Sequence, residues 1–460
     1  MVSWTSLIHD GVRINLSRRS VVSPRWVQYH RMRGEPDRRA ELGRLLTWIR
    51  RIRSNYTMLI RVSIVTTLSH LGYGVLNQSA ITPYAIDLGW TAYLGAISAA
   101  FVIAETIGKT PAGTVIDRIG VRPVYTTAAL VGAVSAVLWT VVHNLPTILV
   151  VRVIDGGASA GAWTGTVVAT SSSVDKAHRP TAMAVFTLTY LAGIALGPLI
   201  GGYANDSTHS TATSFYVTSG LFLVAAAASQ FLLPRVMREE DAETQEPRRS
   251  KSLLASVWFG LKAVPDYMFI AFMTFFAIGL LVPIMKAFAL QQLRMSEESY
   301  GLIALPVALI LAGASLASGT LTKAWGRARS VHVGLAVSAA SMYAVPLIHY
   351  RFDFGVLATL IGLGFAIGMP AWLALISDIS APNVRGAVLG AVGTGQGVGV
   401  IIGNLLGGYL YTDVPFRFPG VHLNSHYSPF MWSAVSLTIA FVLSLIFIRK
   451  GTGRYVTEET

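Results

Sequence analysis

The sequence of 460 residues contains no cysteine. Disulfides, thiolate catalysis and zinc–thiolate sites are therefore excluded, although the absence says nothing about the redox compartment. Charge is also scarce, because only 13% of the residues are charged, against about 25% in an average soluble domain. So few charges leave most of the surface of a folded chain apolar, which lipid tolerates and water does not.

Motifs of common catalytic machinery are missing too. The polar segments contain no nucleotide-binding loop, no metal-ligand cluster and no nucleophile motif. This argues against ATP-driven transport and against an enzyme, so we expect no cofactor and no metal. No cleavable signal peptide is visible, because the first long apolar run begins near residue 57.

The basic residues do not predict a nucleic-acid partner, despite a net charge of +13. Twelve arginines lie between Arg13 and Arg53, before any long apolar run, and most other basic residues lie in short gaps between such runs. Basic residues that flank membrane spans orient a protein in the bilayer. We therefore interpret this charge as topological, with the lipid bilayer as the partner.

Apolar runs of about 20 residues, the length that a helix needs to cross the hydrocarbon core, recur along the chain. They predict an all-α membrane protein with twelve transmembrane helices, near residues 57–79, 91–112, 122–143, 146–168, 180–204, 213–234, 266–289, 299–321, 330–349, 353–377, 386–411 and 428–448. Twelve spans place both termini on one side, which holds 30 of the 36 lysines and arginines. The excess predicts cytoplasmic termini for a multi-pass protein of the plasma or inner membrane.

A charged break between Pro234 and Val264 divides the spans six and six and is typical of an interdomain linker. Leucine and isoleucine at helical spacing among arginines, from Leu42 to Ile52, favour an amphipathic helix on anionic lipid. Residues 1–37 are expected to be a partly disordered tail, with a transit peptide as the alternative. The predicted domains are an N-terminal segment (1–55), a six-helix bundle (56–234), the linker (235–264), a second six-helix bundle (265–450) and a tail (451–460).

The two halves repeat at a constant offset of 206 residues. Gly120 matches Gly326 and Arg179 matches Arg385, and the glycines of one predicted span recur in its counterpart (Gly193, Gly197, Gly201 and Gly202 against Gly399, Gly403, Gly407 and Gly408). A single offset without gaps predicts two pseudo-symmetric six-helix bundles in the same orientation.

A glycine- and charge-rich loop joins the second and third predicted spans. It runs from Gly113 through Asp117, Arg118 and Gly120 to Arg122. This loop resembles the signature loop of the major facilitator superfamily, G-x-x-x-D-R-x-G-R-[RK]-x. It departs from that motif by one residue, because Val121 follows the second glycine and the arginine comes next. Gly120 permits a tight turn, and Asp117 can hold charge-assisted hydrogen bonds. The resemblance implies a conformational latch that holds in one state and breaks in the other.

A second string lies in the fifth predicted span. Gly193, Gly197, Pro198, Gly201 and Gly202 match the G-x-x-x-G-P-x-x-G-G motif that is associated with antiporters of this superfamily. Glycines four residues apart let helices approach closely, and the proline removes one backbone hydrogen bond. The resemblance covers residues 57–450 and is strongest to the twelve-helix drug:proton antiporter group.

Three ionisable residues within spans are candidates for proton coupling. Arg152, with Asp155 and Gly156, resembles the R-x-x-x-G motif whose arginine is implicated in proton transfer, and the alternative is a structural Arg152–Asp155 pair. Glu105 is either a proton-binding carboxylate or a structural one bonded to Lys109.

Further residues are candidates for a central substrate cavity. Lys286 either binds an anionic solute, acts as a counter-ion or extends to the membrane interface. The aromatic and amide candidates are Tyr73, Asn77, Gln78, Tyr190, Trp372 and Gln396. The resemblance implies, as the leading hypothesis, a monomeric secondary transporter that exports small amphipathic solutes or drugs in exchange for protons by alternating access. The alternatives are an importer or facilitator of a polar metabolite, such as a sugar or an organic acid, and a membrane enzyme or sensor.

Overall fold

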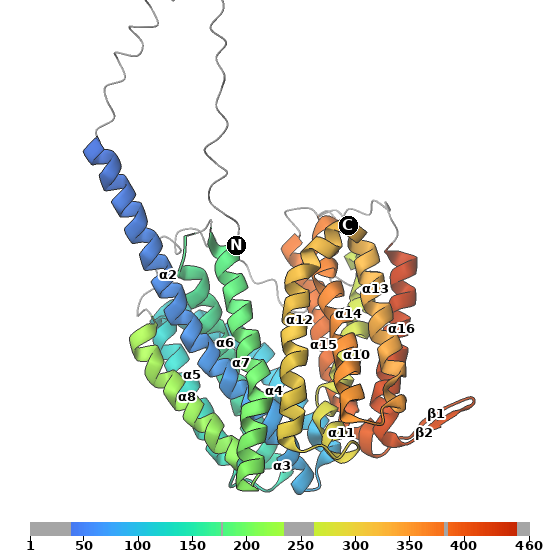
Figure 1. The fold of residues 1–460 in the computed structure, drawn as a ribbon. Coiled ribbons are helices and arrows are strands. Elements are labelled where there is room, and N and C mark those ends of the chain that lie inside the picture. The colour runs from blue at the N-terminus through green and yellow to red at the C-terminus, as the bar shows by residue number, and fades with distance from the viewer. Residues whose placement is uncertain (1–37, 176–177, 234–261, 381–384, 449–460) are drawn as a thin grey trace, which may run out of the picture. The chain divides into compact units, whose positions relative to one another are not determined.

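The computed structural model describes residues 38–175, 178–233, 262–380 and 385–448 (Figure 1). By its internal contacts the chain divides into two units, Met1–Asn55 and Tyr56–Thr460. The described part of the first unit is helical and belongs to α2 (Arg38–Val75). Its expected contact with lipid stays a prediction.

Six membrane-spanning elements form the first bundle. The first span continues from α2 through a π-helical turn, η1 (Leu76–Ala80), into α3 (Ile81–Asp87), and a 3-10 turn, η2 (Thr91–Tyr93), precedes the second. The others are α4 (Leu94–Ile119), α5 (Val121–Trp139), α6 (Leu145–Ser172), α7 (Arg179–Thr208) and α8 (Thr213–Leu232).

Six more elements form the second bundle. Its first span is broken at Pro283 into α10 (Pro265–Leu281) and α11 (Met285–Gln291). The others are α12 (Glu297–Trp325), α13 (Arg327–Tyr343), α14 (Arg351–Asp378), α15 (Arg385–Thr412) and α16 (Ser428–Phe447), with 3-10 turns η5 (Val345–Leu347) and η6 (Ser425–Tyr427). An antiparallel hairpin of β1 (Phe416–Phe418) and β2 (Val421–Leu423) precedes α16.

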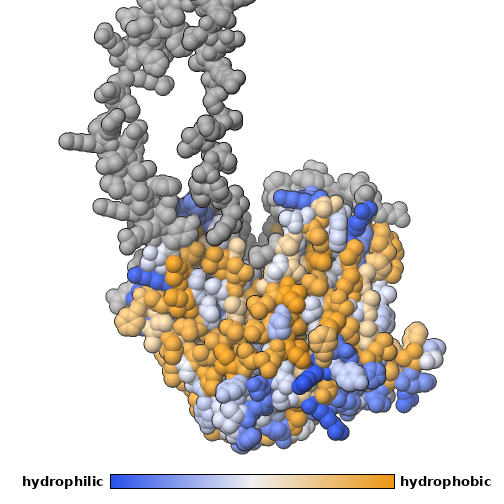
Figure 2. Space-filling model, in the orientation of Figure 1, coloured by the Kyte–Doolittle hydropathy of each residue, from blue (hydrophilic) through white to orange (hydrophobic). Residues whose placement is uncertain are grey.

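The predicted all-α class and its transmembrane helices are confirmed. In the described part of the chain, eleven helices are long and apolar enough to cross a membrane, and α13, at 17 residues, completes twelve crossings. On the face shown in Figure 2, apolar side chains form a broad band across the middle of the molecule, and polar side chains gather toward its two ends. Such a band matches the hydrocarbon core of a bilayer.

Two departures from the predicted spans have a clear physical reason. The first span was expected to end near residue 79, but it continues to Asp87, because η1 winds the polar residues Asn77, Gln78 and Ser79 into the helix. The seventh was expected to be one helix over 266–289, but it breaks at Pro283, which lacks the N–H that a continuous helix requires.

The repeat is visible in the backbone itself. Gly120 and Gly326 lie 206 residues apart, and each ends a helix with a positive φ, of 88° and 86°. Non-glycine residues rarely adopt this conformation, so the same turn requires glycine in both halves.

Candidate functional site

The first span begins, and the last span ends, at one face of the molecule, which we call the terminal face (top in Figure 1). We call the opposite face the distal face. The bundles meet near the distal face. A Cβ atom on Gly95 of α4 would lie 2.0 Å from the carbonyl oxygen of Asn404 of α15, and one on Gly202 of α7 would lie 2.4 Å from that of Glu297 of α12. In Figure 1 the ribbons of α7 and α12 approach toward the bottom and diverge toward the top. The distal ends of the bundles are therefore closed against each other.

A buried ion pair lies in this distal contact. The Nζ atom of Lys286 lies 2.8 Å from Oε2 of Glu297 and also donates to the carbonyl oxygen of Ser79, in the first bundle, at 3.0 Å. Asn205 of α7 donates to both carboxylate oxygens of Glu297, at 3.2 and 3.0 Å. Next to it, the backbone N–H of Glu298 donates to Asp206. Lys286 thus pairs with a protein carboxylate, which is the arrangement that its counter-ion alternative describes.

The antiporter-like glycines serve two different contacts. Gly193, Gly197 and Gly201 face the first span: a Cβ on Gly197 would lie 2.3 Å from the carbonyl carbon of Gly74, and Ser79 donates to the carbonyl oxygen of Pro198 at 3.2 Å. Gly202 faces α12 of the other bundle. The counterparts in α15 repeat the scheme, because Gly399, Gly403 and Gly407 face α10 and Gly408 faces Ala92.

The loop predicted as a latch lies at the terminal face. Asp117 and Arg118 are exposed, and no ion pair to Asp117 exists among the described residues. Arg122 donates from Nε to the carbonyl oxygen of Leu233, at the end of α8, at 2.7 Å. Gly113 has space around it, since a Cβ atom there would meet only Thr164, at 3.9 Å. The latch role of the loop stays a prediction.

Arg152 and Asp155 are buried inside the first bundle. Arg152 Nη1 lies 3.4 Å from Oδ2 of Asp155, and its other nitrogens donate to Ile97 O and Asn77 Oδ1. Asp155 also accepts from Ser135 Oγ and Trp139 Nε1, at 2.5 and 2.9 Å. Every oxygen of the carboxylate is thus partnered, which favours the structural alternative over the proton-transfer one.

Glu105 lies in a more open setting, in the middle of α4. Its side chain is 18% exposed, and Oε1 lies 3.0 Å from Nζ of Lys109, whose side chain is 40% exposed. The Nζ atom of Lys109 in turn lies 5.3 Å from the ring centroid of Trp163 on α6. Gly156 and Gly108 bring α4 and α6 together, since Cβ atoms there would lie 2.5 Å from Phe101 O and 2.9 Å from the Cβ of Ala160.

An aromatic cluster surrounds Trp163. The rings of His70, Phe186 and Tyr190 meet it edge-on, at centroid distances of 5.6, 5.4 and 5.1 Å. These rings come from α2, α6 and α7, next to Glu105 of α4. His70 and Trp163 were not among the predicted cavity residues, since their meeting depends on helices that are far apart in sequence.

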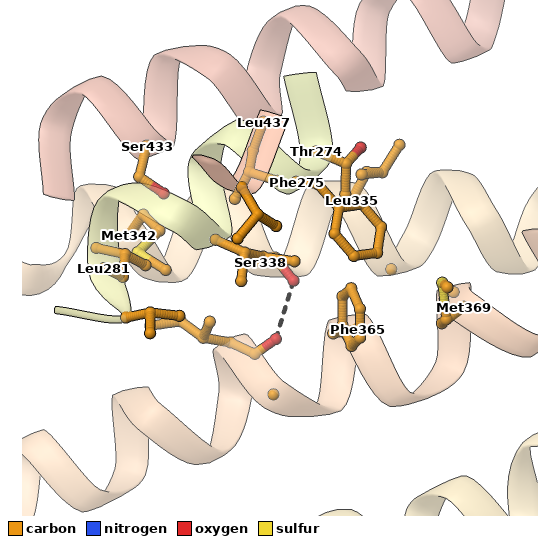
Figure 3. A pocket seen from close by; sticks show the side chains of 18 of the residues that line it. Thr274, Phe275, Leu281, Leu335, Ser338, Met342, Phe365, Met369, Ser433 and Leu437 are labelled. Atoms are coloured by element: carbon orange, nitrogen blue, oxygen red, sulfur yellow. Dashed lines mark hydrogen bonds between the residues drawn. The ribbon is translucent and has the colours of Figure 1, made fainter. Parts of the chain in front are cut away.

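The second bundle contains an apolar pocket of about 460 Å³ (Figure 3). Most of its walls come from α10, α13, α14 and α16, with single residues from α11, α12 and α15, and Gln78 of the first bundle also lines it. Phe275 and Phe365 meet edge-on inside it, with centroids 5.9 Å apart, and Ser338 donates to Ile361 O at 3.0 Å. The pocket is suited to an apolar group of a ligand.

The predicted cavity residues therefore separate into groups. Gln78 and Trp372 line the pocket, and Tyr190 belongs to the aromatic cluster. Tyr73 is buried against Phe222, at a centroid distance of 4.7 Å, and Asn77 accepts from Arg152. Gln396, half-buried on α15, does not line the pocket.

The chain is similar to known membrane transporters. The family model described as Major Facilitator Superfamily matches residues 62–267 and 267–458. Multidrug resistance protein 1 of Bacillus subtilis (strain 168) is 22% identical over 394 residues, which are 82% of this chain and 93% of that protein. Multidrug resistance protein 2 of the same organism is 24% identical over 372 residues, which are 78% of this chain and 86% of that protein. The solved structure of nucleoside transporter NupG matches with a TM-score of 0.68 at 14% sequence identity, and the match covers 85% of this chain and 100% of the NupG chain.

Proposed function

Since the chain belongs to the Major Facilitator Superfamily, we propose that it exports amphipathic solutes in exchange for protons, by alternating access. The observation that carries the proposal is the distal closure around the Lys286–Glu297 pair. A transporter of this kind exposes a central site to one side at a time, by rocking one bundle against the other. With cytoplasmic termini, as the basic residues predict, this conformation is closed on the outside.

The apolar pocket supports an amphipathic substrate. Its lining is dominated by aliphatic, aromatic and methionine side chains, with few polar groups such as Gln78, Thr274 and Ser338. Methionine and aromatic surfaces adapt to ligands of different shape. The names of the two Bacillus relatives, multidrug resistance proteins, agree with this substrate class.

Glu105 is the proposed coupling carboxylate. It is partly exposed and lies beside the aromatic cluster, whereas Asp155 is enclosed by three donors, one each from Ser135, Trp139 and Arg152. Among the described residues, Lys109 of its own helix forms an ion pair with Glu105, and Arg152 of α6 is near enough to interact with it electrostatically. Binding and release of a proton there would change the cost of moving the carboxylate between water and the closed interior.

Solute flux in proteoliposomes with an imposed pH gradient tests the proposal. We expect wild-type protein to move lipophilic dyes against their gradient at the expense of the proton gradient. Glu105→Gln should retain downhill flux at saturating dye concentrations but lose the response to the gradient. Full proton-driven efflux by Glu105→Gln would remove this residue from the coupling role.

Import or facilitated diffusion of a polar metabolite is less well supported. It would need a polar cavity, and a free cation for an anionic solute. The lining of the pocket is apolar, and Lys286 is bonded to Glu297 and Ser79. A sugar or organic acid that competed with dye efflux would favour this alternative.

A further inference from the structure

Lys109 holds its ammonium group where a positively charged ligand would be expected. The Nζ atom lies 3.0 Å from a carboxylate oxygen of Glu105 and 5.3 Å from the centre of the Trp163 ring. A carboxylate and an aromatic face at these distances form a recognition site for organic cations. We infer that Glu105 and Trp163 form a binding site for a monovalent organic cation, which Lys109 occupies until such a ligand displaces it.

The site is prearranged. Trp163 meets His70, Phe186 and Tyr190 edge-on, at interplanar angles of 77°, 80° and 86°. Three rings packed perpendicular to it hold the indole in one orientation, in which the Nζ atom of Lys109 lies over the ring. Trp163 does not depend on Lys109 for its position, and the site therefore persists when the lysine leaves.

The site is also reachable. Gly95 marks the side of α4 that faces the second bundle, and Lys109 lies about 40° around the helix from it, at 100° per residue. The lysine side chain is 40% exposed, and it has a flexible four-carbon stem with which to move aside. A partly exposed ion pair between residues four apart is weak, so an incoming cation with apolar groups can replace it.

This inference rests on the proposed function and specifies its substrate class. One carboxylate serves one cation at a time, whether that cation is Lys109, the ligand or a proton. Exchange at Glu105 then provides a physical reason for antiport, because the ligand and the proton cannot be held together.

Equilibrium binding of tetraphenylphosphonium to the purified full-length protein, at fixed pH and without a gradient, tests the inference. Lys109→Gln removes the internal competitor and should tighten binding by about three- to tenfold. Lys323→Gln is the matched control, since it removes the same charge from an exposed position on α12 and should leave the affinity within about twofold. Glu105→Gln should weaken binding at least about tenfold.

The aromatic contribution is tested by a graded series. Trp163→Phe should bind more weakly than wild type, and Trp163→Leu more weakly still, since a smaller ring and then no ring remains. Tetraphenylborate, an anion of the same shape, should gain nothing from Lys109→Gln. The inference is overturned if Lys109→Gln binds the cation no better than Lys323→Gln, or if both ions gain equally. Because no gradient is used, binding as expected with no proton-driven flux would refute the transport proposal and leave the site standing.

Discussion

Lys286 and Glu297 form an ion pair at 2.8 Å whose two members are each also bonded to the other bundle, through Ser79 and Asn205. The pair therefore links the bundles, although both of its residues belong to the second one. Their side chains are 3% and 11% exposed. A buried pair of this kind is costly to break from one side, since the remaining charge is left without compensation.

The first prediction concerns this link. Glu297→Gln leaves Lys286 as an unpaired cation in the closed state, at a cost of about 3–5 kcal/mol, and should shift the protein toward a conformation open at the distal face. A cysteine introduced by Leu94→Cys, at a position that is 2% exposed, reports the opening. Because the chain has no other cysteine, its labelling by an impermeant maleimide should accelerate at least about tenfold in Glu297→Gln.

A substitution that should favour the closed state provides the control. Asn404 lies in the contact between α15 and α4, and within the described residues neither its Nδ2 nor its Oδ1 atom has a hydrogen-bond partner. A buried amide without partners costs about 1–3 kcal/mol in the closed state. Asn404→Ala should therefore slow the labelling of Leu94→Cys. Equal labelling rates in all three backgrounds would show that the distal contact does not govern opening.

The second prediction concerns helix packing. Alanine normally stabilises a helix interior relative to glycine by about 1 kcal/mol. At Gly197 the added methyl group would overlap the backbone of Gly74, so Gly197→Ala should instead lower stability by about 1–3 kcal/mol. Gly403→Ala, its counterpart against Phe276, should do the same, whereas Gly157→Ala, with nothing within 4 Å, should not. Thermal unfolding in detergent measures all three, and a stable Gly197→Ala would contradict the close packing.

The repeat explains why so much of the fold follows from the sequence. Long apolar runs predict spans, and glycines at a constant offset predict where pairs of spans touch. The hairpin over 416–423 was not predicted, because strands of three residues leave no period to recognise. The extension of the first span to Asp87 was missed because Asn77, Gln78 and Ser79 interrupt the apolar run.

The candidate site was only partly predictable, for a different reason. Glu105, Tyr190 and Gln78 could be selected as polar or aromatic residues inside spans. The contacts that complete the site join different helices. Trp163 is 54 residues from Lys109 along the chain, and Asn205 is 92 residues from Glu297. Glu297 lies in the first turn of α12, where acidic residues commonly stabilise the N-terminus of a helix. Nothing in the sequence distinguishes it from such a residue.

The third prediction distinguishes the two roles of Asp155. If the carboxylate is structural, Asp155→Asn leaves Arg152 buried without its counter-charge and should destabilise the protein by about 3–5 kcal/mol. The double variant Arg152→Met/Asp155→Leu removes both charges and should be less destabilised than the single one. Thermal unfolding measures both. A stable Asp155→Asn protein with uncoupled transport would instead assign Asp155 to proton transfer.

The fourth prediction concerns the pocket of the second bundle. Thr274 lines it and donates only to Ile270 O of its own helix, so Thr274→Trp fills space without removing a bond between helices. Efflux of bulky dyes should fall at least about tenfold, while small solutes of the same charge should be little affected. Competition assays in proteoliposomes compare the two sizes. An equal loss for all solutes would indicate general damage to the protein and would not support a substrate pocket.

The fifth prediction concerns orientation in the membrane. Pro419 lies exposed in the hairpin at the distal face, and Lys323 lies exposed near the end of α12 at the terminal face. Single cysteines made by Pro419→Cys and Lys323→Cys need no cysteine-free background to be built, since the chain has none. In intact cells an impermeant maleimide should label Pro419→Cys only, and in inverted vesicles Lys323→Cys only, because the excess of basic residues predicts that these loops face the cytoplasm. The reverse pattern would place the distal ion pair on the cytoplasmic side, and this conformation would then be closed toward the cytoplasm.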